Sequence, residues 1–521
     1  MRFYSVLFLF FFSVFLLTSG GRIASSDETA FFLEAQSLVE HGTLAIPDSV
    51  VSNGVYGQDG RFYVGGGLGF TLIAMPFYLL GKLVTTAVSV APAVEILIHK
   101  ACFSLTNQII CSLIGCIFFC LCRHFGYAAR LSFFLTCALL FTTNLFPYSK
   151  SAMREPLLTL TLVLAFYFLV RYRTDRRSIN LHGAGFSLFL LINTKVSMLI
   201  VLPVFAFYWL SIFEETRRSA FPDWRLLKNP VFWRHSLPLL GWLLLAAAVI
   251  LTVNWIEFGS FFASGYTSKP QPFTTPLFTG LYGLLLSPGK SFFLYAPVTV
   301  LLFWSWRNFR DRFAAEFIFI AVLALVLLVL HATYFAWAGD GSWGPRYLIP
   351  LLPFCLLVVG ARFHFILEQS GKIFKFAALL LALTGVIIQI GGLSVYYGSY
   401  LRYLGEFPYT RSFEDPEFMV KSHFVPDYSP VIGHWRLLEI SLEKEWAGFQ
   451  PKLALEKSRE RLPVKDPATL VYAIDYWFMY AKYAGIPNAF IWSALLLQMF
   501  FVVLFGAWSL SAIRKDRSLV G

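Results

Sequence analysis

Charged side chains are scarce in this 521-residue sequence: they make up 14% of it, whereas hydrophobic side chains make up 57%. So little charge over such a length excludes an ordinary soluble fold and predicts an all-α polytopic membrane protein. The net charge of +12 does not predict nucleic-acid binding. The Lys and Arg residues stand in short clusters between apolar runs, which is typical of membrane orientation rather than of a basic stripe.

Cysteine is also rare, and its distribution argues against a disulfide framework or a zinc site. There are seven, an odd number, and all lie within apolar segments. We interpret them as small packing residues. They are Cys102, Cys111, Cys116, Cys120, Cys122, Cys137 and Cys355.

The sequence has no internal repeat, no low-complexity tract and no phosphate-binding glycine loop. The run Gly65-Gly66-Gly67-Leu68-Gly69 lacks the strand-turn-helix context of a nucleotide fingerprint. Transporters usually have paired halves with discontinuous helices. The absence of a repeat therefore weighs against a transporter.

The cationic clusters predict the topology. If all of them face the cytoplasm, the apolar runs between them cross in even numbers, which gives about twelve crossings with both termini inside. The clusters are Arg123/His124/Arg130, Arg171/Arg173/Arg176/Arg177, Arg217/Arg218/Arg225/Lys228/Arg234, Arg307/Arg310/Arg312, Lys372/Lys375 and Arg514/Lys515/Arg517. After a first helix at 3–18, the expected spans are 99–122, 131–149, 155–170, a hairpin at 182–212, 237–256, 291–306, 313–338, 346–366, 373–397 and 486–513.

Three segments need separate interpretation. Residues 3–18 fit a cleaved signal peptide or an uncleaved first helix, and we favour the latter because many spans follow. A crossing within 68–97 would place the later Arg clusters outside, so we expect 68–83 to lie in the outer interface or to dip in and return. The hairpin at 182–212 is short for two passes, and its turn at Asn193-Thr194-Lys195 would be tolerated mainly beside a cavity.

We therefore expect three parts. Residues 1–397 form a catalytic membrane module with its first outer loop at 20–98, residues 398–485 form an extracytoplasmic domain, and 486–521 form the last helix and a cytoplasmic tail. Within residues 398–485 we expect helices near Leu437–Lys444 and Leu453–Arg461. The block at 257–290 is expected outside the membrane.

The acidic pair Asp27-Glu28 follows the first hydrophobic segment, where a membrane protein has no obvious structural need for it. One interpretation is a catalytic carboxylate. The alternative is a helix N-cap, in which Asp27 accepts hydrogen bonds from the first turn of a helix that runs to about Glu40.

Other polar residues are expected at the outer ends of the spans, and acids and bases converging there describe a site. Asp59-Gly60 also fits a simple turn, and Lys150 with Arg154 fits snorkelling to headgroups. Lys290 fits a charge at a helix start. Arg346 is favoured as functional because a lone Arg opening a span is desolvated unless it meets an anion. The candidates are Asp27, Glu28, Asp59, Arg61, Lys150, Arg154, Glu155, Lys195, Lys290, Asp340, Trp343, Arg346 and Tyr347.

These residues lie in stretches that resemble GT-C class glycosyltransferases, which include protein O-mannosyltransferases and the aminoarabinose transferase of lipid A. The stretches are Asp27-Glu28-Thr29-Ala30-Phe31-Phe32, Leu38-Val39-Glu40-His41-Gly42-Thr43-Leu44, Gly60-Arg61-Phe62-Tyr63 through Gly69, Ala74-Met75-Pro76-Phe77-Tyr78-Leu79-Leu80-Gly81 and Trp343-Gly344-Pro345-Arg346-Tyr347-Leu348-Ile349-Pro350. The motifs are short, but the layout corresponds over most of the chain. Relatives often carry Lys or another polar residue where this chain has Gly65–Gly67, so Lys195, Lys290 or Arg346 is the candidate for the donor phosphate.

The resemblance implies a GT-C-like bundle with its active site on the periplasmic face of a bacterial inner membrane. It implies a polyprenyl-phosphate sugar as donor, and a lipid, polysaccharide or protein of the envelope as acceptor. Asp27 corresponds to the presumed base, with Glu28 beside it, and Glu155 to a second acid. Arg61, Arg154, Lys195, Lys290, Arg346 and Tyr347 are expected to bind substrate. No cofactor is required, and a divalent cation on Asp27 stays open.

The chemistry needs little more than these groups. Loss of a phosphate monoester needs cations rather than a general acid, and the acceptor hydroxyl needs a base. Direct displacement inverts the anomeric carbon, whereas retention needs a nucleophilic carboxylate. Two other functions stay open: a flippase for a lipid-linked glycan, and an O-antigen polymerase or ligase that uses a pyrophosphate-linked glycan.

Overall fold

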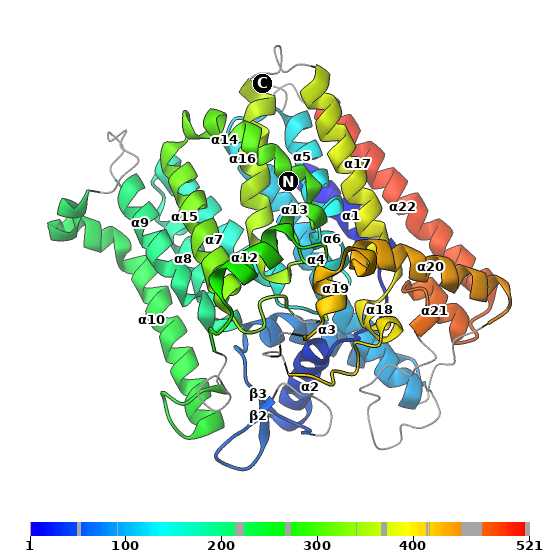
Figure 1. The fold of residues 1–521 in the computed structure, drawn as a ribbon. Helices are drawn as coiled ribbons and strands as arrows, with labels where there is room; N and C mark the ends of the chain where they lie inside the picture. The colour runs from blue at the N-terminus through cyan, green and yellow to red at the C-terminus, as the bar shows by residue number, and fades with distance from the viewer. Residues whose placement is uncertain are drawn as a thin grey trace.

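The structure is a computed structural model, and it describes residues 2–48, 54–90, 92–213, 223–265, 272–339, 341–365, 372–412, 415, 417–449 and 471–515. Helices dominate it (Figure 1). In the first half they are α1 (Arg2–Leu17), α2 (Ser26–His41), α3 (Gly69–Ala87), α4 (Pro92–His124), α5 (Ala129–Phe141), α6 (Leu145–Tyr148), α7 (Glu155–Asp175), α8 (Ser178–Thr194), the 3₁₀ helix η1 (Val196–Val201), α9 (Leu202–Ile212), η2 (Trp224–Lys228) and α10 (Pro230–Phe258). In the second half they are α12 (Leu277–Leu286), α13 (Phe292–Tyr295), η3 (Pro297–Leu301), α14 (Leu302–Arg310), α15 (Ala314–Thr333), η4 (Arg346–Leu351), α16 (Leu352–Phe365), α17 (Lys372–Ser394), α18 (Tyr397–Leu404), α19 (Val420–Phe424), η5 (Pro426–Tyr428), α20 (Pro430–Trp446), α21 (Trp477–Tyr483) and α22 (Asn488–Lys515).

The predicted all-α polytopic membrane architecture is confirmed. Eight helices of the described chain are long and apolar enough to cross a membrane, and four shorter ones are apolar. Not every expected span has a counterpart among these helices, because residues 291–306 are divided into α13, η3 and α14, which are not among them. The block at 257–290 contains the apolar helix α12, which the sequence analysis missed. Helix α3 is long and apolar enough to cross, so the interfacial position expected for 68–83 stays a prediction.

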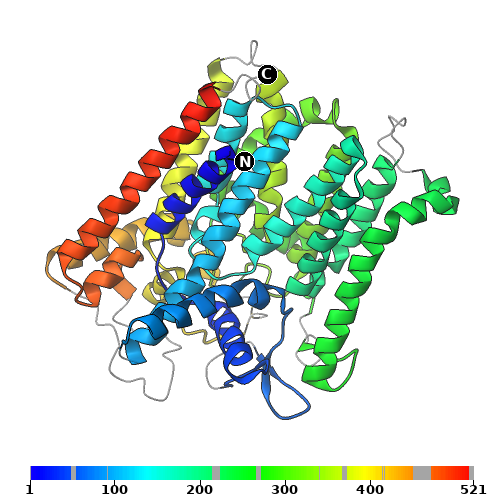
Figure 2. The same ribbon diagram turned by 180° about the vertical axis from the view of Figure 1, so that it is seen from behind.

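Burial separates the centre of the bundle from its periphery. In α7 and in the segment Arg346–Phe363, 78% and 89% of the span is buried, against 6% in α22. The long peripheral helices α10, α17 and α22 flank the bundle (Figures 1 and 2). An apolar helix that exposes nearly all its length is suited to lipid, so the central helices are the ones that carry the core.

The end of the bundle that bears α2 carries a three-stranded antiparallel sheet, which the sequence analysis did not predict (Figure 2). Its strands are β1 (Ala45–Ile46), β2 (Gly54–Tyr56) and β3 (Phe62–Val64), in the order β1-β3-β2. Ala45 pairs with Tyr63, and Val55 pairs with the same residue from the other side. We call this the outer end, as the charge pattern predicts.

Three helices, α9, α14 and α16, are each preceded by a 3₁₀ helix that has a polar residue or a proline at or near its start. The expected break at Lys195 is confirmed, because α8 ends at Thr194 and η1 begins at Val196. Segments η3 and η4 likewise precede α14 and α16, with Pro297 opening η3 and Pro350 inside η4. A proline removes a backbone donor, so a 3₁₀ turn can precede a regular helix at such a start.

Helices α18 to α21 lie beside the outer end (Figure 1). The helix expected near Leu437–Lys444 is present as α20, whereas the one expected at 453–461 lies outside the described residues. Backbone bonds join this part to the bundle, from the Asp475 amide to the Ser394 carbonyl and from the Trp477 amide to the Ser19 carbonyl. The domain boundaries at 397 and 485 stay predictions.

Candidate functional site

Asp27 lies in the first turn of α2, but its side chain is not the cap of that helix. Ser25 is the N-cap: its hydroxyl accepts from the Glu28 amide, and the Glu28 carboxylate accepts from the Ser25 amide. This is a capping box. The interpretation of Asp27 as the cap is therefore wrong, and its carboxylate is available to a residue distant in the sequence.

That residue is Arg346. The Asp27 Oδ2 atom lies 3.0 Å from Arg346 Nη1, and Glu155 Oε1 lies 3.7 Å from Arg346 Nε. The Arg346 and Glu155 side chains are 10% and 8% exposed, whereas Asp27 is 20% exposed. The guanidinium of Arg346 thus stands between two carboxylates, and the three side chains come from three segments that are remote in the sequence. Asp27 is the more accessible of the two acids.

Tyr347 extends this group toward the break after α8. Arg346 Nη2 donates to the Tyr347 hydroxyl at 3.3 Å. The Lys195 ammonium lies 4.5 Å from the centre of the Tyr347 ring, and the buried His331 ring stacks on that ring at 4.6 Å. An ammonium over an aromatic face is stabilised by the ring quadrupole. The expected convergence of Lys195, Arg346 and Tyr347 is present.

Arg154 approaches from the loop before α7. Its guanidinium lies 5.1 Å from the centre of the Phe31 ring, and its Nη1 atom is buried without a hydrogen-bond partner in the described residues. A side chain at Gly66 would approach that atom to 2.6 Å, and one at Gly67 would meet the Asn193 carbonyl at 2.1 Å. Gly66 and Gly67 thus allow the chain to pack closely against Arg154 and the break after α8. They belong to the glycine run that was not expected to bind a nucleotide.

Glu28 has a different environment from its neighbour. Its carboxylate accepts from the backbone amides of Ala24, Ser25 and Ala152 at 2.9, 2.7 and 2.6 Å. These bonds tie the start of α2 to the loop that carries Arg154 and Glu155. Both oxygens of Glu28 therefore have partners, and the carboxylate connects the start of α2 to the loop before α7.

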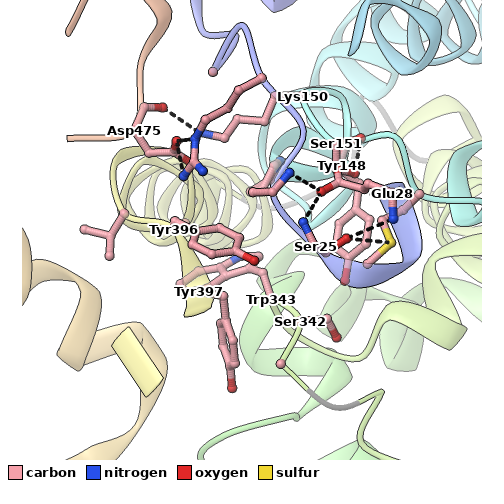
Figure 3. A pocket seen from close by; sticks show the side chains of 18 residues that line it. Ser25, Glu28, Tyr148, Lys150, Ser151, Ser342, Trp343, Tyr396, Tyr397 and Asp475 are labelled. Atoms are coloured by element: carbon pink, nitrogen blue, oxygen red, sulfur yellow. Dashed lines mark hydrogen bonds and ion pairs between the residues drawn. The ribbon is translucent and has the colours of Figure 1, made fainter. Parts of the chain in front are cut away.

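Lys150 belongs to a second group of charges (Figure 3). Its ammonium donates to the Leu393 and Asp475 carbonyls and lies 2.7 Å from Asp475 Oδ2. Arg22 binds the other oxygen at 3.1 Å. Burial alone would raise the pKa of Asp475, but these two cations outweigh it and lower the pKa to about 2.

The other two expected cations lie elsewhere. Arg61 is exposed on the β2–β3 hairpin, where it is 3.6 Å from Asp59. Lys290 is fully buried, donates to the Ser342 carbonyl and lies over the Tyr397 ring. Asp340 lies outside the described residues.

Two residues near this group were not predicted from the sequence: the acid Glu34 and the imidazole His331. Glu34 is buried on α2 and accepts a hydrogen bond from Thr71. Burial raises its pKa to about 8, although the Thr71 bond and the Arg154 charge oppose the shift. It stands seven residues after Asp27, on the same face of the helix, and this spacing could have revealed it. His331 was detectable as a lone imidazole inside an apolar span.

The arrangement offers a partly exposed carboxylate beside several cations and the buried acids Glu155 and Glu34. A carboxylate can take a proton from a hydroxyl, and Arg and Lys side chains can stabilise a phosphate. Among the described residues, three or more His, Cys, Asp or Glu side chains nowhere gather as a metal site. Asp27 instead faces a guanidinium.

No protein-family model matches the chain, and no curated protein matches its sequence significantly. Solved structures are similar to it, and two of these are of one protein. They are ArnT from Cupriavidus metallidurans bound to undecaprenyl phosphate, at 14% identity, and the same protein in the apo state, at 15%. Both match 98% of this chain, cover 77% and 76% of theirs, and have a TM-score of 0.48. A likeness at this level does not establish a shared activity.

Proposed function

We propose that this protein is an integral membrane glycosyltransferase that moves a sugar from a polyprenyl-phosphate donor to an acceptor of the cell envelope. The observation that carries the proposal is the contact of 3.0 Å between the accessible carboxylate of Asp27 and the guanidinium of Arg346, with Glu155 on the other side. It joins a base to a phosphate-binding group at one place. The short GT-C-like stretches of the sequence point the same way.

In this reaction the acceptor hydroxyl oxygen attacks the anomeric carbon, and the bond from that carbon to the phosphate oxygen breaks. The hydroxyl proton passes to the Asp27 carboxylate, and the electron pair of the broken bond leaves with the polyprenyl phosphate. A single displacement inverts the anomeric carbon. A positioned base contributes about 10²–10⁴-fold to such a step.

The cations share the leaving phosphate. Arg154 brings a buried guanidinium nitrogen that has no partner in the described residues, and Lys195 stands over Tyr347 beside Arg346. Glu155 holds Arg346 in place, and Glu28 holds the two acidic segments together. The site would act on the periplasmic face of a bacterial inner membrane, where lipid-linked donors present their sugars.

The test uses purified full-length protein in lipid nanodiscs with radiolabelled polyprenyl-phosphate sugars and an envelope extract. We expect a new glycosidic product and one free polyprenyl phosphate per sugar transferred. Transport of the lipid across the bilayer without a product would favour a flippase. Activity on pyrophosphate-linked glycans alone would favour a polymerase or ligase.

A further inference from the structure

A cavity whose wall includes Ser25 and Glu28 is not used by any of the steps above (Figure 3). It holds about 650 Å³ of empty space when the open solvent at its mouth is included. Its walls come from four parts of the chain: the segment after α1, the loop around α6, the loop at 341–343, and the region of α18 with Asp475.

The cavity adjoins the proposed base through two residues. Ser25 lines it and stands two positions before Asp27. Met153 also lines it, and its sulfur lies 3.9 Å from both Ser25 Oγ and Arg346 Nη1. A ligand in the cavity is therefore separated from the Asp27–Arg346 pair by a single flexible thioether side chain.

The wall contains two buried tyrosine hydroxyls, those of Tyr148 and Tyr397, and Ser342 is the neighbour of the first. Tyr148 and Tyr397 are 4% and 5% exposed, and neither hydroxyl has a hydrogen-bond partner of normal geometry among the described residues. Buried polar atoms are nearly always bonded, and leaving one unbonded is costly. Both hydroxyls can donate and accept, so they suit a ligand that carries hydroxyl groups.

The charges of the wall indicate an uncharged ligand. Arg22 and Lys150 are balanced by Asp475 and Glu28, two cations against two anions. The three protons of the Lys150 ammonium have acceptors in Leu393 and Asp475, so this cation is already bound within the chain. A phosphate finds no surplus of positive charge here, and an isoprenoid chain would have to lie against buried ionic groups.

The aromatic side chains supply the complementary feature. Tyr396, Tyr397 and Trp343 gather on the side opposite Ser25 and Glu28 (Figure 3). The indole nitrogen of Trp343 donates to Gln389, which fixes the ring. Aromatic surface combined with hydroxyl partners suits a sugar ring, whose C–H bonds pack on the aromatic surface and whose hydroxyls meet polar atoms.

We propose that this cavity binds an uncharged sugar ring of the acceptor and that Tyr148 and Tyr397 hydrogen-bond to its hydroxyls. The acceptor is then a glycan or a glycolipid rather than a protein hydroxyl. The identification of the bound sugar as part of the acceptor rests on the proposed function. The existence of the sugar site does not.

The experiment measures saturation-transfer NMR of methyl α-glucoside, mannoside and galactoside with the full-length protein in phosphatidylcholine nanodiscs, which contain no competing sugar. Methyl glucuronide and glucose 6-phosphate are the charged comparators, and farnesyl phosphate is the lipid competitor. The variants are Tyr148→Phe and Tyr397→Phe. The control is Tyr295→Phe, whose buried hydroxyl is also without a partner in the described chain but lies outside the cavity wall.

We expect at least one uncharged glycoside to bind and each of the two variants to weaken it by about three- to tenfold, the loss of one neutral hydrogen bond. Tyr295→Phe should bind as the wild type does, and farnesyl phosphate should leave the signal unchanged. Binding of no uncharged glycoside, equal binding in both variants, tighter binding of a charged sugar, or displacement by farnesyl phosphate would each overturn the proposal.

The same assay separates this proposal from the function. Asp27→Asn should abolish transfer and keep glycoside binding. Glycoside binding that depends on Tyr148 and Tyr397, together with no transfer by the wild type, would reject the transferase and keep the sugar site. Transfer without such binding would reject the sugar site alone.

Discussion

Two groups of charges lie near the outer end of this protein, and they differ in how deeply the acid is buried: the Asp475 side chain is 5% exposed and the Asp27 side chain 20%. In one, Asp475 is surrounded by Arg22, Lys150 and the Tyr480 hydroxyl, and Lys150 uses its protons on Asp475 and Leu393. In the other, Arg346 stands between two acids, with Glu155 at 3.7 Å. That distance is longer than a hydrogen bond.

This difference indicates that the two groups have different roles. Saturated ionic groups hold elements together, because removing one member leaves a buried charge without compensation. A partly exposed acid beside a cation can be reached by a ligand, as the groups of functional sites are. We therefore assign fold assembly to the Asp475 group and chemistry to the Asp27 group.

The largest expected effect comes from breaking the second group at Asp27. Asp27→Asn keeps the size of the side chain but removes the base, so transfer should fall by about 10²–10⁴-fold. Thermal unfolding should change less than in Asp475→Asn, because Glu155 still faces the Arg346 guanidinium when Asp27 is neutral. The measurement is the rate of sugar transfer per folded protein in nanodiscs.

Asp59→Asn is the control for this prediction. It removes an acid from the same outer loop at the exposed hairpin, and its rate should stay within about twofold of wild type because exposed ion pairs contribute little. Wild-type transfer by Asp27→Asn would remove Asp27 from the mechanism. A large loss in Asp59→Asn would bring the hairpin and Arg61 back into the site.

The next largest effect is on stability and breaks the first group. Asp475→Asn leaves Arg22 and Lys150 buried beside a neutral side chain, which should cost about 3 kcal/mol of unfolding free energy. Asp311→Asn, at an exposed pair with Arg310, should cost less than about 0.5 kcal/mol. Denaturant unfolding in detergent measures both, and equal losses would refute the assignment of fold assembly to Asp475.

Much of this site was predictable because membrane insertion orders the chain in one dimension. Once the cationic clusters set the orientation, Asp27, Glu155, Lys195 and Arg346 had to lie near one level. The contact between Asp27 and Arg346 and the break at Lys195 followed from that level and from the cost of an unpaired Arg at a span end.

Placement within the level was not predictable. Lys150 and Arg154 are four residues apart, yet one binds Asp475 and the other lies over Phe31. Position along the membrane normal does not separate them, since the difference arises from lateral packing. The role of Asp475 depends on a pairing 325 residues apart, and no local periodicity encodes it.

The third prediction sharpens the contrast between the adjacent acids Asp27 and Glu28. Glu28→Gln retains one acceptor oxygen for three backbone amides, so we expect a loss of about 1.5 kcal/mol in unfolding free energy. Transfer by the folded fraction should fall far less than in Asp27→Asn. Assay of both variants at a temperature where each is folded distinguishes them, and the reverse order would show that Glu28 is the base.

The smallest effect concerns pH and the buried acid Glu34. Burial raises its folded-state pKa to about 8 from a usual value of 4.5, so the folded protein binds the proton more tightly than the unfolded chain does. Its contribution to stability is therefore full below about pH 4.5 and is lost as the pH rises through 8. We expect the melting temperature in nanodiscs to decline between pH 6 and 8.5, and Glu34→Gln to flatten that decline.

Glu40→Gln is the matched control on the same helix, because hydrogen bonds from Tyr78, Gln36 and Lys82 outweigh its burial and lower its pKa. A carboxyl with a lowered pKa is ionised throughout this range, so the Glu40 variant should keep the wild-type slope. An unchanged slope in Glu34→Gln would mean that Glu34 stays ionised in the fold, with Arg154 and Thr71 outweighing its burial.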